Sequence, residues 1–438
     1  MESTSRGSWS GHLGFVLAAA GSAIGLGNIW RFPYATGENG GGAFVLVYLG
    51  AVILVGVPIL VSEVVLGRTT QRNPVGAFRS LAGPGPWPLV GYIGVIAGFV
   101  ILSYYGVVAG WALYYLVLSA SGALTGMDSA AIQGMFDSLT GSASRQVAWQ
   151  ALFMLATIVV VSRGVEAGIE RASKVLMPLL FGFLLVLLGY ALTSEKALAG
   201  LAFFLEPRFG DLTWNSILAA LGQAFFSLSL GMGAMITYGS YLERKKSVAR
   251  PVLMIVAMDT GVAILAGLVI FPLVFSYNLD PSGGPGLVFV VLPQAFVRMP
   301  ATSLLSALFF GLLVFAALTS AISLLEVVVA FAVDELGWTR SYASWIGGSL
   351  IFALGVPSAI SSSFLGWADR VASELMLPVG GLFIALFVAW AIPEAAAKDG
   401  YRGRQGGLKG FYQWRFCLRY VVPIAVAVIL LQNIGLLG

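Results

Sequence analysis

The sequence is poor in charge: 24 basic and 20 acidic residues make up only 10% of its 438 residues. Ordinary soluble domains carry about 25% charged residues, and a chain with so few cannot coat a whole globule with a surface that faces water. In addition, 58% of the residues are hydrophobic and the mean hydropathy is +0.90. The composition excludes a soluble globular protein and intrinsic disorder, and it predicts a polytopic membrane protein.

Cysteine and histidine each occur once, as Cys417 and His12. A single cysteine excludes a secreted disulfide scaffold, and a single histidine cannot build a zinc site or a proton relay alone. Only Asp259 among the aspartates lies deep in an apolar segment, whereas an intramembrane hydrolase would need a catalytic pair. We therefore expect no enzyme activity. The net charge of +4 is not gathered into a basic stripe with aromatics, so we expect no nucleic-acid partner.

Eleven apolar segments follow one another along the chain, separated by glycine, proline and charged residues. About 20 apolar residues suffice for a helix to cross the hydrocarbon core of a bilayer. No stretch between the segments is long enough for a separate domain, so residues 1–438 are expected to form one all-α transmembrane domain. The predicted spans are residues 13–37, 42–68, 88–121, 147–162, 168–193, 214–241, 251–277, 302–336, 342–356, 371–393 and 411–435.

The basic residues are unevenly distributed between the two sides of the predicted spans. If the N-terminus is cytoplasmic, 18 Lys and Arg residues fall in the inner segments and 5 in the outer ones. Such residues are enriched on the cytoplasmic side of membrane proteins. We therefore predict a multi-pass plasma-membrane protein with a cytoplasmic N-terminus. Because the number of predicted spans is odd, the C-terminus is expected outside the cell.

Two of the segments contain glycines and polar residues where a spanning helix should be most apolar. The first carries three glycines with Ser22 and Asn28 within residues 20–28, and the sixth repeats this composition in residues 226–233. Either segment alone could be a helix-packing face of small residues. Two of them, about half a chain apart, favour a repeat with two broken helices around a midplane site. Unwinding there would free amides that suit a carboxylate and carbonyls that suit a cation.

Three acidic residues lie within apolar segments, where a carboxylate costs about 2.5–3.5 kcal/mol. For Glu63 and Glu326 the alternatives are ion binding and internal hydrogen bonding, and for each we favour the hydrogen bond. Asp259 belongs to an oxygen-only group that suits a hard cation rather than zinc or copper. The other members of this group are Asn28, Ser227, Thr319 and Ser320.

Residues 21–33 read GSAIGLGNIWRFP and residues 38–44 read ENGGGAF. Together with residues 163–178, 222–233 and 315–320, these motifs resemble the neurotransmitter:sodium symporters, in particular their bacterial amino-acid transporters. The resemblance covers nearly the whole chain. It implies 11 transmembrane helices in a 5+5 inverted repeat with broken helices 1 and 6. The implied boundaries are about 10–195 for the first repeat, about 212–393 for the second and about 411–435 for an extra helix.

The resemblance implies sodium-coupled symport of a hydrophobic or aromatic L-amino acid into the cell by alternating access. The alternative is a transport-inactive amino-acid sensor, which would keep the same binding site, and a substrate-gated channel is less favoured. The implied partners are the amino acid, sodium ions and the lipid bilayer. The sequence does not define the preferred amino acid or the oligomeric state.

The resemblance places the substrate at the two breaks. The substrate carboxylate would meet the amides near Leu26 and Gly27 and the hydroxyl of Tyr105. Gly25 leaves room where relatives that carry amines have an aspartate, which favours a substrate with its own carboxylate. The flexible thioether of Met232 could admit large apolar side chains. The implied substrate-binding residues are Ser22, Ala23, Gly25, Leu26, Gly27, Ile101, Tyr105, Phe226, Ser227, Ser229, Met232, Ser320 and Leu324.

Two sodium sites are implied. The first, Na1, would use the substrate carboxylate together with Ala23, Asn28, Ser227 and Asp259. The second, Na2, would use Gly21, Ile24, Ala316, Thr319 and Ser320. A ligand shared by substrate and ion couples their affinities reciprocally. Because Asp259 stands where chloride-dependent relatives have asparagine, we expect a fixed negative charge and no chloride requirement.

The resemblance also implies two gates and a hinge. Arg31 and Asp369 would pair on the outer side of the site. The cytoplasmic side would be closed by a second group, formed by Arg6, Asp334, Trp9 and Tyr241. Gly168 and Pro178 are spaced so that the fifth helix could unwind between them, because proline removes a backbone donor.

Overall fold

The computed structural model describes residues 7–245, 247–281, 286–402 and 407–433. Within these residues the regular elements are helices, and one isolated β-bridge joins Gly41 to Pro207. The predicted all-α class is therefore confirmed for the described part of the chain. Arg6, expected at the inner gate, lies outside the described residues.

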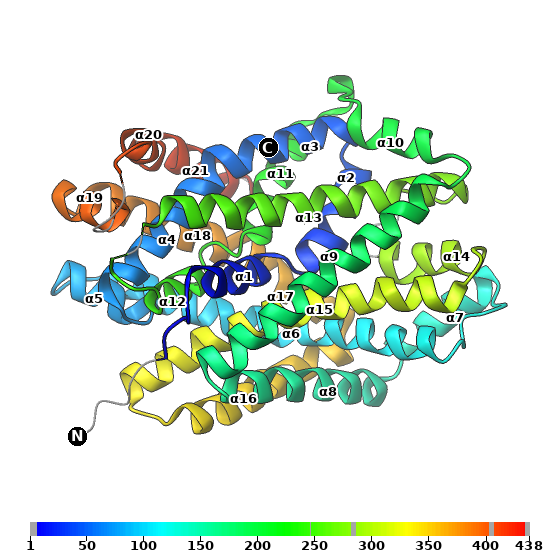
Figure 1. Cartoon of the computed structure of the whole chain (residues 1–438), viewed down its shortest axis with the longest axis horizontal. Helices are drawn as coiled ribbons and strands as arrows, with labels where there is room; N and C mark the ends of the chain where they lie inside the picture. Colours follow the sequence, from blue (N-terminus) through cyan, green and yellow to red (C-terminus); the bar gives the residue numbers. More distant parts are fainter. Residues whose placement is uncertain (1–6, 246, 282–285, 403–406, 434–438) are drawn as a thin grey trace.

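Nine uninterrupted helices in the described part are long and apolar enough to cross a membrane. Most of them run along the long axis of the molecule in Figure 1. Five spans consist of a single labelled helix: α6 (Pro88–Ala120), α8 (Ala143–Ser162), α13 (Ala249–Ser276), α15 (Thr302–Leu336) and α16 (Arg340–Ile360). Four contain π-helical segments: α3 (Gly42–Ala51) with α4 (Val57–Thr70), α9 (Arg171–Leu192) with its preceding turn, α17 (Ser362–Arg370) with α18 (Leu377–Leu386), and α20 (Phe411–Phe416) with α21 (Val422–Asn433).

The first predicted span is broken. Helix α1 (His12–Ala23) stops where Ile24 adopts an extended conformation, with φ −71° and ψ 103°. A π-helical turn (Gly27–Arg31) and α2 (Phe32–Glu38) continue the span, and the second half is bent by 48° from the first. The glycines on both sides of Leu26 allow close packing here, because a β-carbon at Gly25 would lie 2.4 Å from Oγ of Ser320 and one at Gly27 would lie 2.8 Å from a ring carbon of Phe226.

The sixth predicted span is broken more widely, between α11 (Trp214–Ser227) and α12 (Ala234–Ser240). Ser229, Gly231 and Gly233 have φ values of 54°, 79° and 75°. A right-handed helix cannot include such left-handed residues, so the chain crosses the middle of the molecule as an irregular loop. With α1 and α2 taken as one span, ten spans pass a test of length and composition in the described part, and the predicted number of eleven is not confirmed.

Short helices cover both ends of the bundle (Figure 1). At one end lie α5 (Pro74–Ala82) and α19 (Glu394–Arg402), and at the other lie α7 (Ser129–Thr140), α10 (Ala197–Leu205) and α14 (Leu292–Phe296). The side chains of Asn73 and Asp128 accept hydrogen bonds from backbone amides at the starts of α5 and α7, as N-cap residues do.

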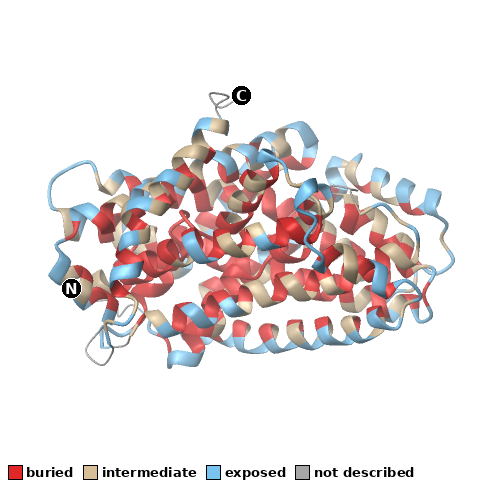
Figure 2. Ribbon diagram, turned by 90° about the horizontal axis from the view of Figure 1, so that it is seen from above, coloured by how far each residue is buried: buried red, intermediate tan, exposed pale blue. Residues whose placement is uncertain are grey.

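Buried residues concentrate in the middle of the molecule, and exposed residues lie at its surface (Figure 2). Helices α6 and α15 pack against each other and are mostly buried. In the span that holds α9 and in the last span only 28% and 33% of the apolar window is buried, as expected for helices that face lipid. Both interrupted helices meet α6 and α15 in the interior, and this arrangement defines the candidate site.

Candidate functional site: a pocket between two interrupted helices

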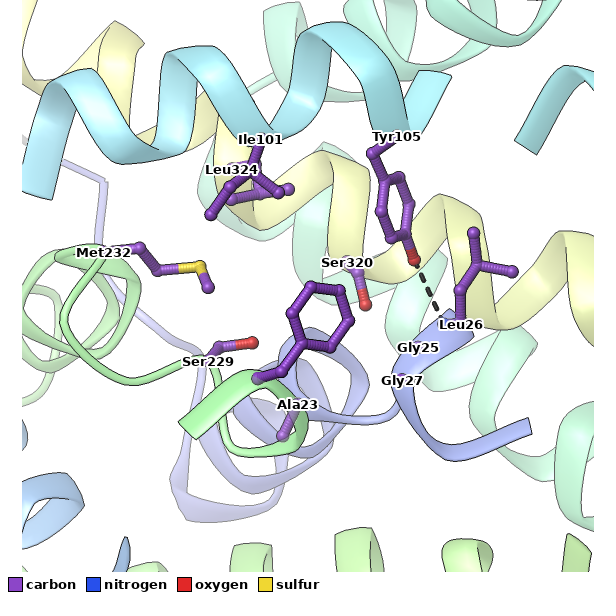
Figure 3. Close-up of a pocket in the computed structure, with 11 residues that line it drawn as sticks. Ala23, Gly25, Leu26, Gly27, Ile101, Tyr105, Ser229, Met232, Ser320 and Leu324 are labelled. Carbon is purple, nitrogen blue, oxygen red and sulfur yellow. Dashed lines mark hydrogen bonds between the residues drawn. The ribbon is translucent and has the colours of Figure 1, made fainter. Parts of the chain in front are cut away.

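A pocket lies between the two breaks and is closed on its other sides by α6 and α15 (Figure 3). About 330 Å³ at this place is free of protein atoms, including the part that is open to the surroundings. Of the thirteen residues that the resemblance implies for substrate binding, Ser22 and Ser227 lie outside the pocket wall. The wall is formed by Ala23, Gly25, Leu26, Gly27, Ile101, Tyr105, Phe226, Ser229, Met232, Ser320 and Leu324.

One side of the pocket is polar. The hydroxyl of Tyr105 accepts a hydrogen bond of 3.2 Å from the backbone amide of Leu26, shown as a dashed line in Figure 3. A β-carbon at Gly25 would lie 2.4 Å from Oγ of Ser320 and 3.0 Å from the hydroxyl oxygen of Tyr105. The room that Gly25 leaves is therefore filled by these two hydroxyl groups. These two hydroxyls and the Leu26 amide are the polar groups on this side of the pocket.

The opposite side of the pocket is apolar. In Figure 3 Ile101 and Leu324 lie beside each other, and the side chain of Met232 extends toward the same region. Each of the three is less than 5% exposed. The pocket thus combines backbone hydrogen-bonding groups at one end with aliphatic and thioether carbons at the other, which suits a small amphiphilic solute.

Ser22 stands just behind the wall. Its hydroxyl donates to Oγ of Ser323 at 2.7 Å, so the side chain points into α15. Its carbonyl oxygen accepts hydrogen bonds from the hydroxyls of Ser229 at 3.0 Å and Ser320 at 3.1 Å. This carbonyl connects the first break to both the sixth-span loop and α15.

A buried polar cluster adjoins the pocket. The side-chain nitrogen of Asn28 donates to the carboxylate of Asp259 at 2.7 Å and to Oγ of Ser227 at 3.1 Å. The hydroxyl of Ser227 donates to the other oxygen of the same carboxylate at 2.8 Å. Asn28 of the first span and Ser227 of the sixth therefore converge on the carboxylate of Asp259 on the seventh span. At most 1% of each is exposed.

A second group of oxygens lies along the contact between α1 and α15. The hydroxyl of Ser320 lies 3.4 Å from the carbonyl oxygen of Ile24. The hydroxyl of Thr319 donates to the carbonyl oxygen of Ala316 at 3.0 Å. A β-carbon at Gly21 would lie 3.2 Å from Cβ of Thr319, so the two helices touch closely here. All five residues of the implied second sodium site therefore come from these two facing segments.

Two residues that the sequence reasoning did not assign to the site support it. The hydroxyl of Tyr48 on α3 donates to Oγ of Ser227 at 3.2 Å. The side-chain nitrogen of Gln223 on α11 donates to the carbonyl oxygen of Gly27 at 2.8 Å. Both are buried, and a buried polar group needs a partner. Their polarity within apolar segments was the available signal, but the sequence could not identify the partners.

Glu63 on α4 stabilises the sixth-span loop. One of its carboxylate oxygens accepts a hydrogen bond of 2.7 Å from the backbone amide of Gly231. A lipid environment offers no water to this freed amide, so an acceptor from a neighbouring helix is required. The favoured interpretation of Glu63 as a partner for the backbone of a broken helix is therefore confirmed.

The expected outer gate is arranged differently from the prediction. Among the described residues, no Arg31–Asp369 ion pair within 4.0 Å is present. The carboxylate of Asp369 instead accepts a hydrogen bond of 2.9 Å from the hydroxyl of Tyr104 on α6. The guanidinium carbon of Arg31 lies 4.6 Å from the ring centroid of Phe226, on the pocket wall.

On the opposite side, Trp9 packs into the bundle. Its indole nitrogen donates to the carbonyl oxygen of Tyr238 at 2.9 Å. The hydroxyl of Tyr241 donates to Glu326 at 2.5 Å, and the same carboxylate forms an ion pair with Arg340. The favoured internal hydrogen-bond role of Glu326 is thus confirmed. Two of the implied inner-gate residues, Trp9 and Tyr241, therefore lie in one connected network.

The other implied inner-gate residue within the described part, Asp334, accepts hydrogen bonds of 3.0 Å from the backbone and side-chain amides of Asn73.

The implied hinge in the fifth span is helical in this structure. The helix runs without interruption from Val165 to Leu192 through both Gly168 and Pro178.

These features are typical of one class of protein: polytopic membrane transporters, in which the solute site lies between discontinuous helices. Sequence comparison places it more closely. The sequence profile of the sodium:neurotransmitter symporter family matches residues 6–131 and 130–437, and the chain belongs to this family. The predicted family and the absence of an enzyme function are confirmed, because the relatives are transporters.

Individual relatives agree with this family. An uncharacterized sodium-dependent transporter of Bacillus subtilis (strain 168), YhdH, is 43% identical over 442 residues, which cover 98% of both chains. An uncharacterized sodium-dependent transporter of Haemophilus influenzae is 33% identical, also over 98% of both chains. The crystal structure of MhsT in complex with L-phenylalanine matches with a TM-score of 0.92 at 45% identity, and covers 98% of this chain and 100% of that chain. The predicted fold class and sodium-dependent transport across a membrane are thereby supported.

Proposed function

We propose that this protein is a symporter that couples the entry of a hydrophobic or aromatic L-amino acid to sodium. The observation that carries the proposal is the position of an amphiphilic pocket next to the buried Asn28–Ser227–Asp259 cluster. A zwitterion with an apolar side chain matches the pocket, and a hard cation matches the oxygens beside it. The bound L-phenylalanine of the similar MhsT structure supports the same substrate class.

The amino acid is proposed to lie with its carboxylate toward the amides of Leu26 and Gly27 and the hydroxyl of Tyr105. Its ammonium would face the carbonyl oxygens of the two breaks, and its side chain would point toward Ile101, Met232 and Leu324. The pocket is narrow, and its wall includes Met232. The flexible side chain of Met232 is well suited to widen it, because a thioether adapts readily to different shapes.

Two sodium ions are proposed. Na1 lies among Ala23, Asn28, Ser227 and Asp259 and shares the substrate carboxylate. For this, Asn28 must turn its amide so that its oxygen, rather than its nitrogen, faces the ion. Na2 lies between the first break and α15, with Gly21, Ile24, Ala316, Thr319 and Ser320 as its ligands. Release of Na2 would loosen this contact and favour opening of α1 toward the cytoplasm.

We further propose that the permanent charge of Asp259 makes transport independent of chloride.

The N-terminus is assigned to the cytoplasm and the C-terminus to the outside, as the distribution of basic residues favours. Alternating access would then open the Arg31–Asp369 side and the Trp9–Tyr241 side in turn.

Uptake by proteoliposomes tests the function. We expect a radiolabelled amino acid such as L-phenylalanine to accumulate under an inward sodium gradient. Accumulation should saturate, and it should vanish when potassium replaces sodium or when an ionophore collapses the gradient. Apolar and aromatic amino acids should compete, and acidic ones should not. Binding without accumulation would instead indicate a sensor, and sodium current without substrate would indicate a channel.

A further inference from the structure

Two arginines on the last span converge on the same carbonyl oxygen. Arg415 and Arg419 lie four residues apart, and each donates a hydrogen bond of 3.3 Å to the carbonyl oxygen of Ala389. Ala389 lies near the end of the preceding span, where the last carbonyls have no helical partner. The end of a helix carries about half a unit of negative charge, which does not neutralise two guanidinium groups.

Arg415 is also incompletely hydrogen-bonded. Only 7% of the residue is exposed, and in the described part of the chain its Nε and Nη1 atoms have no hydrogen-bond partner. No carboxylate of the described residues forms an ion pair within 4.0 Å with either arginine of this pair. A buried cation without a counter-charge is costly, and like charges four residues apart on a helix repel each other.

The nearby acidic residue, Glu394, does not form an ion pair with either arginine. Glu394, at the start of α19, forms an ion pair of 2.7 Å with Lys398. This hydrogen bond and the charge of Lys398 lower the pKa of the Glu394 carboxyl below its ordinary value. The charges of Arg415 and Arg419 act on the same carboxyl as smaller causes, so its negative charge is felt by the arginine pair but is paired directly with Lys398.

Aromatic side chains mark the depth of the arginine pair in the membrane. The guanidinium carbon of Arg419 lies 5.2 Å from the ring centroid of Trp390. Trp390 contacts Tyr420 edge to face, and Tyr420 contacts Phe416. All three rings are about half exposed or more. Exposed Trp and Tyr side chains gather at the level of the lipid headgroups, so the arginine pair lies there too.

We propose that Arg415 and Arg419 form a binding site for the phosphate group of an anionic phospholipid. Guanidinium groups bind phosphate oxygens through paired hydrogen bonds, and a phosphate would supply the negative charge that the protein lacks here. The acyl chains would lie along the exposed apolar surface that continues from Phe416 and Tyr420 to Ile424. This continuity favours a lipid over a soluble phosphate. The lipid would join the last span to the end of the preceding one.

Native mass spectrometry of the purified full-length protein tests the site. The protein is mixed with phosphatidylglycerol or with phosphatidylcholine of the same acyl chains, and retained lipid molecules are counted. We expect the wild type to retain one phosphatidylglycerol with about tenfold preference over phosphatidylcholine. Arg419→Gln and Arg415→Gln should each abolish most of this preference. Arg419→Lys should retain part of it, since the charge remains without the planar fork.

Arg244→Gln is the matched control, because Arg244 is exposed on the segment between α12 and α13 and its loss removes the same charge. Its lipid preference should equal that of the wild type. Equal phosphatidylglycerol retention by the Arg419→Gln variant would overturn the proposal, as would complete displacement of the lipid by millimolar inorganic phosphate. Arg419 is only half-buried, so this variant remains informative if Arg415→Gln fails to fold. The site does not depend on the proposed substrate, and sodium-driven uptake is measured separately in phosphatidylcholine vesicles.

Discussion

At the scale of single residues, the candidate site contains buried polar groups whose free energy depends on their hydrogen-bond partners. The carboxylate of Asp259 is buried and accepts hydrogen bonds from both Asn28 and Ser227. In an apolar helix this charge would be costly alone, but donors and a cation can offset the cost. Asp259 and Tyr105 are therefore the residues at which a small chemical change should have a large effect.

Asp259→Asn removes the negative charge while keeping the size of the side chain. We expect sodium-driven uptake without chloride to fall about tenfold or more, because the cation loses its nearest full counter-charge. Uptake is measured in proteoliposomes with chloride or gluconate as the anion. Restoration by chloride would support the charge argument further. The exposed Asp211→Asn variant should behave as wild type, and undiminished chloride-free uptake by Asp259→Asn would contradict the proposed role.

Tyr105→Phe removes the hydroxyl that accepts from the amide of Leu26. If this group also contacts the substrate carboxylate, the affinity for the amino acid should fall about three- to tenfold, the range for one lost hydrogen bond. Equilibrium binding of the radiolabelled amino acid at saturating sodium provides the measurement. Tyr342→Phe, an exposed tyrosine on α16, is the control. Unchanged affinity of the Tyr105→Phe variant would place the carboxylate elsewhere.

At the scale of elements, the two breaks are held open by different means. The first is a short interruption next to glycines, whereas the loop of the sixth span has three residues with positive φ. Glu63 from α4 supplies the acceptor that the loop's own helix no longer provides. The break is therefore a structural feature with its own stabilising contacts, and its glycines should not tolerate a side chain.

Gly231→Ala should destabilise the folded protein. The residue has a φ of 79°, which costs an alanine about 1–2 kcal/mol. A β-carbon would also lie 2.3 Å from the carbonyl oxygen of Leu377. We expect a clear fall of the thermal unfolding midpoint in detergent, followed by intrinsic fluorescence.

Gly222→Ala on α11 is the matched control for this change. A β-carbon at Gly222 meets no atom within 4 Å. Alanine within a helix is more stable than glycine by about 0.5–1 kcal/mol, so this variant should melt at the same temperature as the wild type or higher. Equal melting temperatures of the Gly231→Ala and Gly222→Ala variants would show that the left-handed conformation is not required.

At the scale of the whole molecule, the bundle brings the pocket and the buried polar cluster together at the first break. If the pocket holds the proposed amino acid and the cluster the proposed sodium ion, an ordered first break would serve both. On the side of the bundle that is proposed to face the cytoplasm, hydrogen bonds and an ion pair connect helices that are distant in the sequence; the residues involved are Trp9, Tyr241, Glu326 and Arg340. Opening that side must break these contacts, and ligand release should be coupled to it.

Sodium and the amino acid should raise each other's affinity by the same factor. Linkage requires this equality for any pair of coupled sites, and typical couplings are about 5- to 150-fold. We expect the amino-acid dissociation constant to fall when sodium replaces potassium, and the sodium constant to fall equally when the amino acid is saturating. Calorimetric titrations in both orders measure the two factors. An amino-acid affinity that is the same with and without sodium would contradict the proposal that the substrate carboxylate is also a ligand of the sodium ion.

Composition and the pattern of glycines indicated the membrane environment and the positions of both breaks, and the resemblance of the motifs indicated the family. These properties are local. The hydrophobicity of a segment and the backbone conformation of a glycine depend on residues that are close together along the chain. The roles of Glu63 and Glu326 were also inferred correctly, since a buried carboxylate in a helix must find a donor wherever it lies.

Only the tertiary structure decided which distant residues became partners. Tyr48 and Gln223 reach the site from α3 and α11, and Tyr104 takes the place expected for Arg31 beside Asp369. The same applies to Arg415 and Arg419, whose shared carbonyl lies on another span. Hydrogen bonds and ion pairs act over a few ångströms, and which groups come that close depends on how the helices pack. The sequence therefore determined where the helices break, and the packing determined what meets at the breaks.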